Sequence, residues 1–369
     1  MKSARLVGLF AAATLLAAGT SANAQITVGV AGPMTGQYAS FGEQLRNGAN
    51  LAIEDINAAG GVLKQQLKLS VGDDACDPKQ ARATADRLAG QRVPVVFGHF
   101  CSSSSIPASE AYAEGNVLQI SPASTNPTYT ERKLWNTFRV CGRDAQQGAL
   151  AGKYLADNFK GKKIAILDDK STYGAGLANE TKKALNALGI TEAMKESYTQ
   201  GDKDFTALVS RMKAAEIDVV FIGGYHTESG LILRQMRDQG MKTLLMAGDA
   251  LADKQFAAIT GQHAEGVLMT FGSDPRNRPA AAEIVKKFKA KGIDPEGYTL
   301  YTYAAVQVWA QAVAKANSTD PKKVAEAMKA GKWQTVLGEI SFDAKGDITV
   351  TDYVMYQWKA DGTYAELKK

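Results

Sequence analysis

Short runs of β-branched and aliphatic residues alternate with amphipathic segments along almost the whole chain, and this alternation restricts the possible folds more than any other feature. We expect strands at residues 26–30, 68–72, 93–98, 117–120, 163–168, 218–223 and 243–248. Between the first two strands, residues 43–58 place Leu45, Ala49, Ile53 and Ile56 on one helical face. Regular alternation of this kind predicts an α/β protein with parallel sheets that are covered by helices on both faces.

The chain has 369 residues, which is too long for one small core, and its pattern restarts near the middle. Further helices are expected at residues 79–89, 145–159, 174–188, 229–239, 280–291, 300–316 and 321–330, and a closing strand at 350–358. We therefore expect two lobes that share the chain discontinuously. Residues 25–143 plus 272–351 would form the first lobe, and residues 144–271 plus 352–369 the second.

The first 24 residues have the features of a cleaved export signal. Lys2 and Arg5 precede an apolar run over residues 6–18, which is followed by an A-x-A sequence at 22–24. The run is too short to span a bilayer comfortably, so a membrane anchor is the weaker alternative. Cleavage after Ala24 would leave an exported chain of 345 residues.

The charge balance gives no support for nucleic-acid binding. The formal net charge is +5, and it falls to +3 when the two basic residues of the export signal are removed. The remaining chain contains no run of Lys or Arg. A nucleic-acid-binding protein would be expected to carry a pronounced basic surface.

The three cysteines suggest one disulfide in the exported protein. Cys76 follows the strand expected at 68–72, and Cys101 follows the strand expected at 93–98, with a helix between them. In such a βαβ unit the parallel strands end at the same edge of the sheet. We therefore expect a Cys76–Cys101 disulfide and a buried free thiol at Cys141. The cysteine spacing fits no zinc site.

The segment at residues 98–105 is the best candidate for binding an anion. It joins the end of a strand to the start of a helix, with Pro107 expected in the first helical turn, and it carries four consecutive serines from Ser102 onward. Helix N-termini present unpaired N–H groups and partial positive charge, which suits a carboxylate. The alternative is that these serines only cap the helix.

Other polar loops are expected on the same rim and on the facing rim. The segment 121–125 and the segment 32–41 also follow strands of the first lobe, and ligands of open α/β sheets bind at the carboxyl ends of strands. Tyr173, Tyr225 and Asp249 each come just after a strand of the second lobe. A carboxylate and two phenols there could pair with an ammonium group and cover an apolar side chain, although each residue taken singly could be an ordinary surface or packing residue.

Enzymatic catalysis fits the sequence poorly. The three histidines, His99, His226 and His263, form no H-E-x-x-H motif and no metal-ligand cluster. His99 lies near Ser102 in the sequence, but the G-x-S-x-G turn of a hydrolase is missing. Phosphate-binding loops of the Walker and Rossmann types are also missing. We therefore expect a protein that is not an enzyme and uses no metal or cofactor.

Six motifs, spread in order over the exported chain, resemble the periplasmic branched-chain amino acid-binding proteins, which are the leucine/isoleucine/valine-binding components of ABC importers. The motifs are DINAAGG at 55–61, DDACDPKQ at 73–80, GHFCSSS at 98–104, SPA at 121–123, YGAGLA at 173–178 and GGYH at 223–226. The resemblance implies a type I periplasmic-binding-protein fold, in which two doubly wound parallel-sheet lobes are joined by a three-stranded hinge. It also implies a periplasmic protein that captures a small aliphatic amino acid in the interlobe cleft and delivers it to an ABC permease. We expect it to act as a monomer.

The resemblance also implies a set of ligand contacts. The ligand carboxylate would bind Ser102 and the backbone of the two Ser/Thr loops, Ser124 included. The ammonium group would contact the Ala123 carbonyl, the Thr125 hydroxyl and the acidic Asp249. Tyr173 and Tyr225 would close over the ligand, and Phe41 and Phe100 would line its side-chain pocket. The resemblance also implies the Cys76–Cys101 disulfide.

Two departures from the family pattern bear on the choice of ligand. Asp249 stands where Glu is expected, and Phe100 stands where the best-known members have Leu. The aspartate keeps the charge but shortens its reach, and the phenylalanine would make the side-chain pocket shallower. Because one methylene in an apolar pocket is worth about 1–3 kcal/mol, we expect preference for Val, Ala, Pro or γ-aminobutyrate over Leu.

Four other functions are weighed against this one. A protein of the same fold could bind another small carboxylate or amide, such as an aromatic acid, but Asp249 would then be buried without a partner. A sensor domain would need a transmembrane or output segment, which is not seen after Lys369. A secreted hydrolase would depend on Ser102. A repressor of related fold would need a DNA-binding helix pair where the export signal lies.

Overall fold

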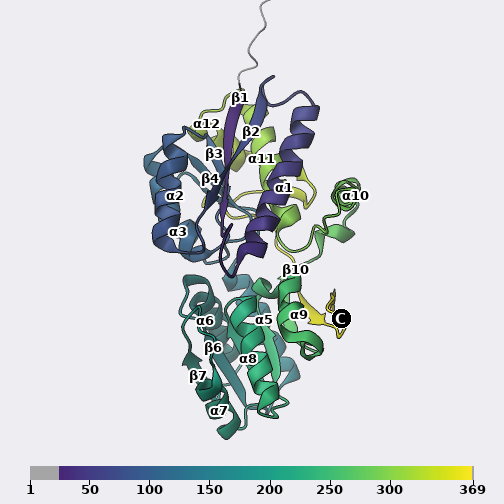
Figure 1. Ribbon diagram of the computed structural model, residues 1–369. Helices are drawn as coiled ribbons and strands as arrows, with labels where there is room; N and C mark the ends of the chain where they lie inside the picture. The colour runs from purple at the N-terminus through teal and green to yellow at the C-terminus, as the bar shows by residue number, and fades with distance from the viewer. Residues whose placement is uncertain (1–24, 368–369) are drawn as a thin grey trace, which may run out of the picture.

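The computed structural model describes residues 25–367 and arranges them as two α/β lobes, one above the other (Figure 1). The export signal proposed for residues 1–24 lies outside the described residues. Within the part of the chain that is described, no helix is both long and apolar enough to cross a membrane. The predicted fold class, two α/β lobes with a three-crossing hinge, is confirmed.

Lobe I is built on a five-stranded parallel sheet with the strand order β2-β1-β3-β4-β5. Its strands are β1 (Gln25–Gly32), β2 (Gln66–Asp73), β3 (Val95–Gly98), β4 (Leu118–Ser121) and β5 (Thr137–Arg139). Its helices are α1 (Ala39–Ala58), α2 (Pro78–Gly90), α3 (Ser102–Glu114), α4 (Thr128–Glu131), α10 (Ala282–Ala290), α11 (Thr299–Ala316) and α12 (Pro321–Ala330). The central strands β3 and β4 are buried throughout because helices cover both faces of the sheet.

Lobe II is built on a seven-stranded sheet with the order β14-β13-β10-β9-β8-β6-β7. Its strands are β6 (Ile164–Asp168), β7 (Met194–Ser197), β8 (Val219–Gly223), β9 (Leu244–Ala247), β10 (Leu268–Gly272), β13 (Tyr353–Trp358) and β14 (Tyr364–Glu366). Its α-helices are α5 (Asp144–Asn158), α6 (Thr172–Ala187), α7 (Thr206–Ala214), α8 (His226–Asp238) and α9 (Lys254–Thr260). Short 3₁₀ turns occupy Asp249–Leu251 and Gly261–Ala264 in this lobe, and Pro275–Asn277 and Pro279–Ala281 after the chain has returned toward lobe I.

The chain passes between the two sheets three times. It leaves lobe I after β5, returns after β10, and enters lobe II again just before β13. On the return, α11 packs along α1, and Lys287 of α10 forms an ion pair with Asp55 of α1 at 2.6 Å. A small hairpin of β11 (Lys332–Thr335) and β12 (Gly338–Ser341) packs on the helices of lobe I.

Several details differ from the sequence-based expectation. The lobe II sheet is mixed, because β13 runs antiparallel to β10 and β14 antiparallel to β13. Helix α1 starts at Ala39 rather than at residue 43. Pro107 was expected in the first turn of its helix, but α3 already begins at Ser102, so the proline lies inside the helix. The short strands β5, β7, β10 and β14 and the β11–β12 hairpin were not anticipated.

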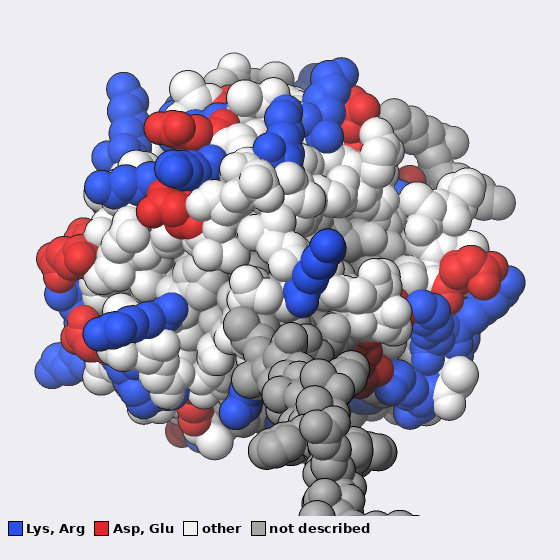
Figure 2. Space-filling model, turned by 90° about the horizontal axis from the view of Figure 1, so that it is seen from above, with Lys and Arg blue, Asp and Glu red and all other residues white. Residues whose placement is uncertain are grey.

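The face of lobe I seen from above carries charged residues of both signs. In Figure 2, basic and acidic side chains are interspersed on this face, and they form no continuous basic stripe there. A stripe of one sign would be the electrostatic signature of a phosphate-binding surface. The face that is visible in this view is therefore of mixed charge.

Candidate functional site

The first turn of α3 lies at the carboxyl edge of the lobe I sheet. Strand β3 ends at Gly98, and α3 begins at Ser102 after Cys101, whose side chain makes no capping hydrogen bond. The Ser102 hydroxyl accepts a hydrogen bond from the backbone N–H of Asn126 at 3.3 Å. This serine therefore links two loops and does not cap its helix. The backbone N–H groups of Ser104 and Ser105 donate to the Cys101 carbonyl. Those of Ser102 and Ser103 lack an intrahelical acceptor, so this end of α3 can receive a carboxylate.

The loop after β4 packs directly on the loop after β3. The Ser124 hydroxyl donates to the carbonyl of Phe100 at 2.9 Å and lies 2.6 Å from the Ser105 hydroxyl. Ser124 thus uses its side chain to join the loops and can offer a ligand only its backbone. The Thr125 hydroxyl is fully buried and has no hydrogen-bond partner among the described residues. A buried hydroxyl without a partner is costly, so this position is suited to a group supplied by a ligand.

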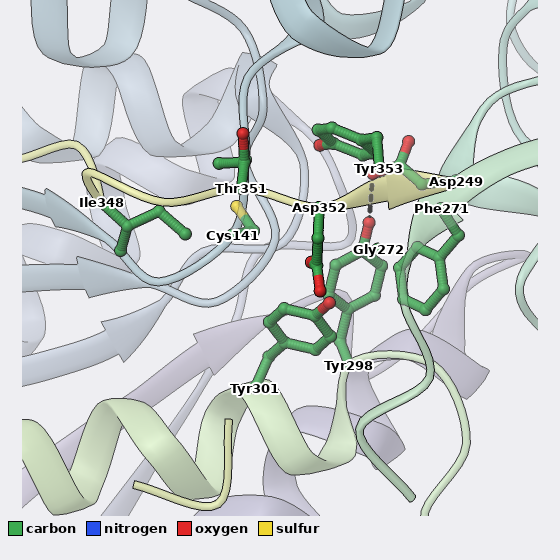
Figure 3. A pocket seen from close by; sticks show the side chains of 11 residues that line it. Cys141, Asp249, Phe271, Gly272, Tyr298, Tyr301, Ile348, Thr351, Asp352 and Tyr353 are labelled. Carbon is green, nitrogen blue, oxygen red and sulfur yellow. Dashed lines mark hydrogen bonds between the residues drawn. The ribbon is translucent and has the colours of Figure 1, made fainter. Parts of the chain in front are cut away.

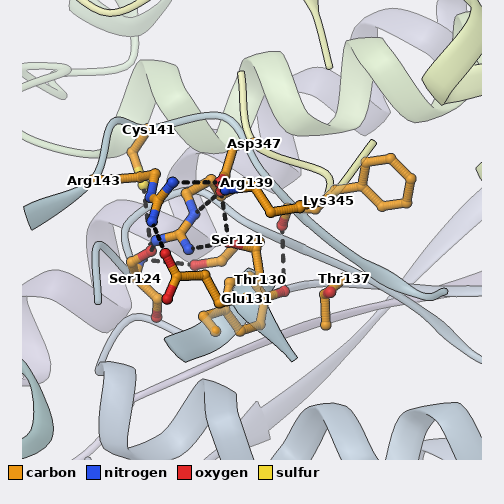
Figure 4. A network of polar contacts seen from close by, with 12 residues as sticks. Ser121, Ser124, Thr130, Glu131, Thr137, Arg139, Cys141, Arg143, Lys345 and Asp347 are labelled. Carbon is orange, nitrogen blue, oxygen red and sulfur yellow. Dashed lines mark hydrogen bonds and ion pairs between the residues drawn. The ribbon is translucent and has the colours of Figure 1, made fainter. Parts of the chain in front are cut away.

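A fully buried arginine holds this second loop in place (Figure 4). Arg139, the last residue of β5, donates to the carbonyl of Ser124 at 2.7 Å and to that of Asn126 at 3.1 Å. It thereby fixes the backbone on both sides of Thr125. Its remaining N–H groups donate to the Thr130 hydroxyl and to the carboxylate of Asp347, each at 2.7 Å.

In lobe II, a buried carboxylate faces this edge from the start of a 3₁₀ turn. Asp249 follows β9 and accepts hydrogen bonds from the hydroxyls of Tyr173, at 2.7 Å, and Tyr298. Burial raises the pKa of Asp249, while the two tyrosine hydroxyls act in the opposite direction. A buried carboxylate whose direct donors are neutral can still pair with a cation.

An aromatic cluster separates the two rims. The Phe100 ring stacks on the Phe41 ring with 4.1 Å between centroids. It also lies 6.2 Å from the Tyr225 ring and meets the Tyr298 ring edge-on at 5.3 Å. Tyr225 in turn lies 5.2 Å from Tyr173. Rings from both lobes therefore pack against one another.

A second set of contacts joins the lobes away from these loops. The carboxylate of Glu228, on α8, accepts hydrogen bonds from the Tyr38 hydroxyl at 3.0 Å and from the Gln37 amide at 2.7 Å. On the other side of α1, the Gln44 amide donates to Asp253 at 2.9 Å. Because these bonds cross from lobe I to lobe II, the structure is the closed form.

The nine predicted ligand residues all lie in the interior between or beside the lobes. Each is no more than 6 % exposed: Phe41, Phe100, Ser102, Ala123, Ser124, Thr125, Tyr173, Tyr225 and Asp249. The structure joins Phe41, Phe100, Tyr225, Tyr173 and Asp249 through direct ring or hydrogen-bond contacts. It joins Ser102, Ala123, Ser124 and Thr125 within the two adjoining lobe I loops. Their contacts with a ligand remain a prediction.

Two residues of this region were missed by the sequence-based interpretation. Tyr298 reaches Asp249 from the segment before α11, where the sequence shows only the approach to a helix. Asp144 is the first residue of α5, is fully buried, and has both carboxylate oxygens without a hydrogen-bond partner in the described structure. An acidic residue at a helix start is ordinarily explained by the helix dipole, so its sequence position gave no signal of a site.

A small cavity lies next to Asp249 at the hinge (Figure 3). It is lined from the first crossing by Cys141 and Gly142 and from the third by Thr351 and Asp352. Tyr298, Tyr301 and Phe271 close its other sides. The chain segments that must bend when the lobes separate therefore meet at one place beside the candidate site.

The predicted disulfide is confirmed. Cys76 and Cys101 are bonded, with 5.6 Å between their Cα atoms, and Cys141 is a buried free thiol whose pKa is raised by that burial. The two ring nitrogens of His99 face Asp74 at 2.5 Å and the Tyr112 hydroxyl at 3.0 Å. His99 is therefore committed to the core of lobe I, which argues against a Ser102–His99 hydrolase. Among residues 25–367, no group of three or more His, Cys, Asp or Glu could hold a metal ion.

Comparison with known proteins gives consistent matches over almost the whole chain. A family model described as periplasmic binding protein matches residues 25–363. The Leu/Ile/Val-binding protein homolog 1 of Brucella suis is 51 % identical over 357 residues and covers 96 % of both chains. A leucine-, isoleucine-, valine-, threonine- and alanine-binding protein of Pseudomonas aeruginosa is 43 % identical, covering 99 % of this chain and 98 % of its own. The crystal structure of a leucine binding protein of Thermotoga maritima superimposes with a TM-score of 0.86 at 28 % identity, over 93 % of this chain and 98 % of that one.

Proposed function

This chain belongs to the periplasmic binding protein family, and from that premise we propose that it is the solute-binding component of an ABC importer for small aliphatic amino acids. The ligand would be held in the cleft between the lobes and released to the membrane subunits of the permease. The names of the Brucella and Pseudomonas relatives, which refer to branched-chain and other small amino acids, support this ligand class.

The observation that carries the proposal is the opposite polarity of the two rims. Lobe I offers the Ser102 hydroxyl, the Thr125 hydroxyl and the first-turn N–H groups of α3, while lobe II offers the carboxylate of Asp249. A zwitterion needs donors at its carboxylate and acceptors at its ammonium group, because a buried charge is tolerated only when it is paired. An α-amino acid satisfies both rims at once.

The proposed contacts follow from this polarity. The ligand carboxylate would lie against Ser102 and the backbone of the loop that contains Ser124. The ammonium group would bind the Ala123 carbonyl, the Thr125 hydroxyl and Asp249. Tyr173 and Tyr225 would cover the ligand from lobe II, and Phe41 and Phe100 would line its side chain.

The lobes would close only around a ligand that makes contacts with both of them. A ligand shifts the balance between open and closed forms only if it binds the closed form better. Tyr173 and Asp249 come from lobe II, so their contacts with a ligand held on lobe I would exist only after closure. The direct bonds of Glu228 with Tyr38 and Gln37 would also be made on closure and would be common to every ligand.

The aromatic cluster favours a short ligand side chain. Phe100 is fixed by the stacked Phe41 on one side and by Tyr298 on another, so the ring cannot swing away without breaking these contacts. We propose that Val, Ala, Pro and γ-aminobutyrate bind more tightly than Leu. An affinity near micromolar would correspond to about −8 kcal/mol.

Isothermal titration calorimetry with Leu, Ile, Val, Ala, Pro, Thr and γ-aminobutyrate tests this proposal on protein that has been unfolded and refolded to remove any retained ligand. The expected result is binding of several of these solutes, with Val or Ala tighter than Leu. If none of them binds, the function is wrong. If Leu binds most tightly, the size argument is wrong.

A serine pair on α3 tests the carboxylate position. Ser102→Ala removes a hydroxyl at the first turn, whereas Ser109→Ala removes a buried hydroxyl further along the same helix that donates to Ile106. We expect Ser102→Ala to weaken amino acid binding at least tenfold and Ser109→Ala to leave it within about twofold. Equal effects of the two changes would mean that Ser102 acts only through the fold.

The cellular setting is proposed on the same basis. Residues 1–24 would direct the chain to the periplasm and be removed there, and the closed monomer would dock on the importer. The rigid units would divide at 143/144, 271/272 and 351/352, so that each boundary falls in or beside a crossing. Small-angle scattering with and without Val should detect a more compact particle when the ligand is present.

A further inference from the structure

Asp144 is a buried carboxylate that has no assigned role in the site described above. It is the first residue of α5 and follows the first crossing directly. Its backbone N–H donates to the carbonyl of Thr125 at 3.0 Å, which ties it to the proposed ammonium loop. Its side chain is fully buried, and neither carboxylate oxygen has a hydrogen-bond partner among residues 25–367.

No cation of the protein neutralises this carboxylate. Arg139 is the basic residue that acts on it, but its N–H groups are used by Asp347, Thr130 and two loop carbonyls. The acidic residues that act on Asp144 are Asp249, from the 3₁₀ turn after β9, and Glu180, from α6. The other titratable groups that sense its charge are Cys141, Tyr173, Tyr225 and Tyr353.

Two buried carboxylates that act on each other's charge, as Asp144 and Asp249 do, are unlike charged surface groups because both cannot readily stay ionised without a cation. Removing an ionised carboxylate from water costs several kcal/mol, and a neighbouring like charge adds to this cost. Burial first, and the charge of Asp249 second, raise the pKa of Asp144 to about 8. At neutral pH Asp144 is therefore mainly protonated as long as no cation pairs with it. The Thr125 hydroxyl lies close enough to Asp144 to lower the pKa of this carboxyl group, against the effect of burial. Neither side chain completes a hydrogen bond among the described residues, so both can accept an N–H donor from a ligand.

We infer that Asp144 is a second carboxylate for the ammonium group of the ligand, and that the ammonium group and a proton compete for it. This inference rests on the proposed function. An ammonium group has three N–H donors. Acceptors are offered by Asp249 in the 3₁₀ turn after β9, by Asp144 at the start of α5, and by the loop of Ala123 and Thr125 after β4. The site then selects amines that can donate N–H groups. A deaminated acid supplies no donor, and a quaternary ammonium group supplies charge without N–H.

Asp144→Asn separates this role from a structural one. Asparagine imitates a protonated aspartic acid in size and hydrogen bonding but cannot be ionised. If Asp144 binds the ammonium group, the variant loses affinity for L-valine at pH 8 by at least tenfold. It also discriminates less between L-valine and its deaminated analogue, 3-methylbutanoate. If Asp144 stays protonated and only supports the loop, the variant binds L-valine like the unaltered protein, and the inference is overturned.

Glu180→Gln is the matched control, because it removes the other nearby acidic charge on α6 without touching the proposed ligand contacts. Its affinity for L-valine should stay within about twofold of the unaltered protein. If Glu180→Gln loses as much affinity as Asp144→Asn, the affinity depends on the total negative charge near the site. A direct contact between Asp144 and the ligand would then be contradicted.

The pH profile gives a second measurement that does not depend on any variant folding well. Lowering the pH from 8 to 6 protonates Asp144, so the affinity of the unaltered protein for L-valine should fall several-fold, while that of Asp144→Asn should change little. A flat profile in the unaltered protein would contradict the competition. If L-valine, L-alanine and L-leucine all fail to bind the unaltered protein at any pH, the proposed function itself fails. If the amino acids bind but the affinity does not depend on Asp144, only the inference about Asp144 fails and the proposed function stands.

Discussion

The ring of Phe41 stacks on the ring of Phe100, with 14° between their planes. The first ring comes from the start of α1 and the second from the loop after β3. Each therefore restricts the rotation of the other. Edge-on contact with Tyr298 closes a third side. This packing places a rigid aromatic ring where a flexible aliphatic side chain would leave more room for a ligand.

Phe100→Leu should enlarge the side-chain pocket and shift selectivity toward longer ligands. We expect the ratio of Leu to Ala affinity to rise by roughly tenfold or more, since a methylene in an apolar pocket is worth about 1–3 kcal/mol. Calorimetry with both amino acids measures the ratio. Phe205→Leu, at the start of α7 within lobe II, is a control of the same size away from the cleft. An unchanged ratio in Phe100→Leu would mean that other residues set the pocket depth.

Tyr298→Phe should weaken ligand binding by removing one of the two hydroxyls that donate to Asp249. Hydrogen bonds to charged groups contribute about 1.5–3 kcal/mol. The Tyr298 hydroxyl also lowers the pKa of Asp249, so the pKa of Asp249 rises when this hydroxyl is removed, and more of the carboxyl group is protonated at low pH. The loss of affinity should therefore be larger at pH 6 than at pH 8. Tyr301→Phe, in the first turn of α11, serves as the control because its ring borders the same hinge cavity while its hydroxyl is not one of the two that donate to Asp249. Equal losses in both variants would contradict a specific role for the Tyr298 hydroxyl.

Arg139→Met should destabilise the protein strongly, because it leaves Asp347 buried and two loop carbonyls without donors. Breaking a buried ion pair on one side costs about 3–5 kcal/mol, which chemical denaturation can measure. The double variant with Asp347→Asn should recover part of this loss. Arg143→Met also removes a contact with Asp347, but from a partly exposed residue. Its cost should stay below about 1 kcal/mol.

Much of lobe I and of its rim could be predicted from the sequence because the signals are local. Ser102 and Thr125 each lie four residues after the end of a short apolar strand, β3 and β4 respectively. The carboxyl ends of parallel strands share one edge, so the two loops had to lie together. The Cys76–Cys101 pairing followed from the same geometry. Asp249 was found in the same way, after β9.

The remaining features depend on contacts between segments far apart in the sequence. Tyr298 meets Asp249 only because the second crossing brings the start of α11 to the cleft. Strand β5 has three residues, too few for a period. Strand β13 joins lobe II from the third crossing, and its antiparallel direction follows from that entry rather than from its residues. Glu228 and Tyr38 are ordinary helix-start residues until the lobes close.

The stability of the ligand-free protein should fall as the pH rises from 4 to 7, and Asp169 should cause part of this change. Its pKa is raised to about 7 by burial, with further contributions from neighbouring acids such as Glu228. The folded state then holds a proton that the unfolded chain has released near pH 4. Stability is full below pH 4 and declines until about pH 7, by about 4 kcal/mol at most for this group.

Denaturation at several pH values measures this effect. Asp169→Asn should flatten the dependence between pH 4 and 7, whereas Asp157→Asn, on an exposed pair with Lys153, should not alter it. A stability that rises over this range in the unaltered protein would contradict the assignment.

Removal of the disulfide should affect both stability and ligand binding. Cys76 and Cys101 are 25 residues apart, and a loop of this size corresponds to about 3–4 kcal/mol in the chain-entropy model. Cys101 immediately precedes Ser102, and the Cys76 sulfur lies 3.9 Å from the Tyr225 hydroxyl. The double variant Cys76→Ser/Cys101→Ser should therefore unfold at lower denaturant concentration and bind amino acids more weakly.

Reductant provides the decisive comparison for this disulfide. Added dithiothreitol should move the unfolding midpoint of the unaltered protein toward that of the double serine variant and leave the variant itself unchanged. Cys141→Ala is the control, because this buried thiol closes no loop, and its response to reductant should match that of the unaltered protein. If reduction lowers stability but leaves the amino acid affinity intact, the bond constrains the unfolded chain without positioning the first turn of α3. If neither quantity changes under conditions that are shown to reduce the bond, the chain-entropy argument fails for this loop.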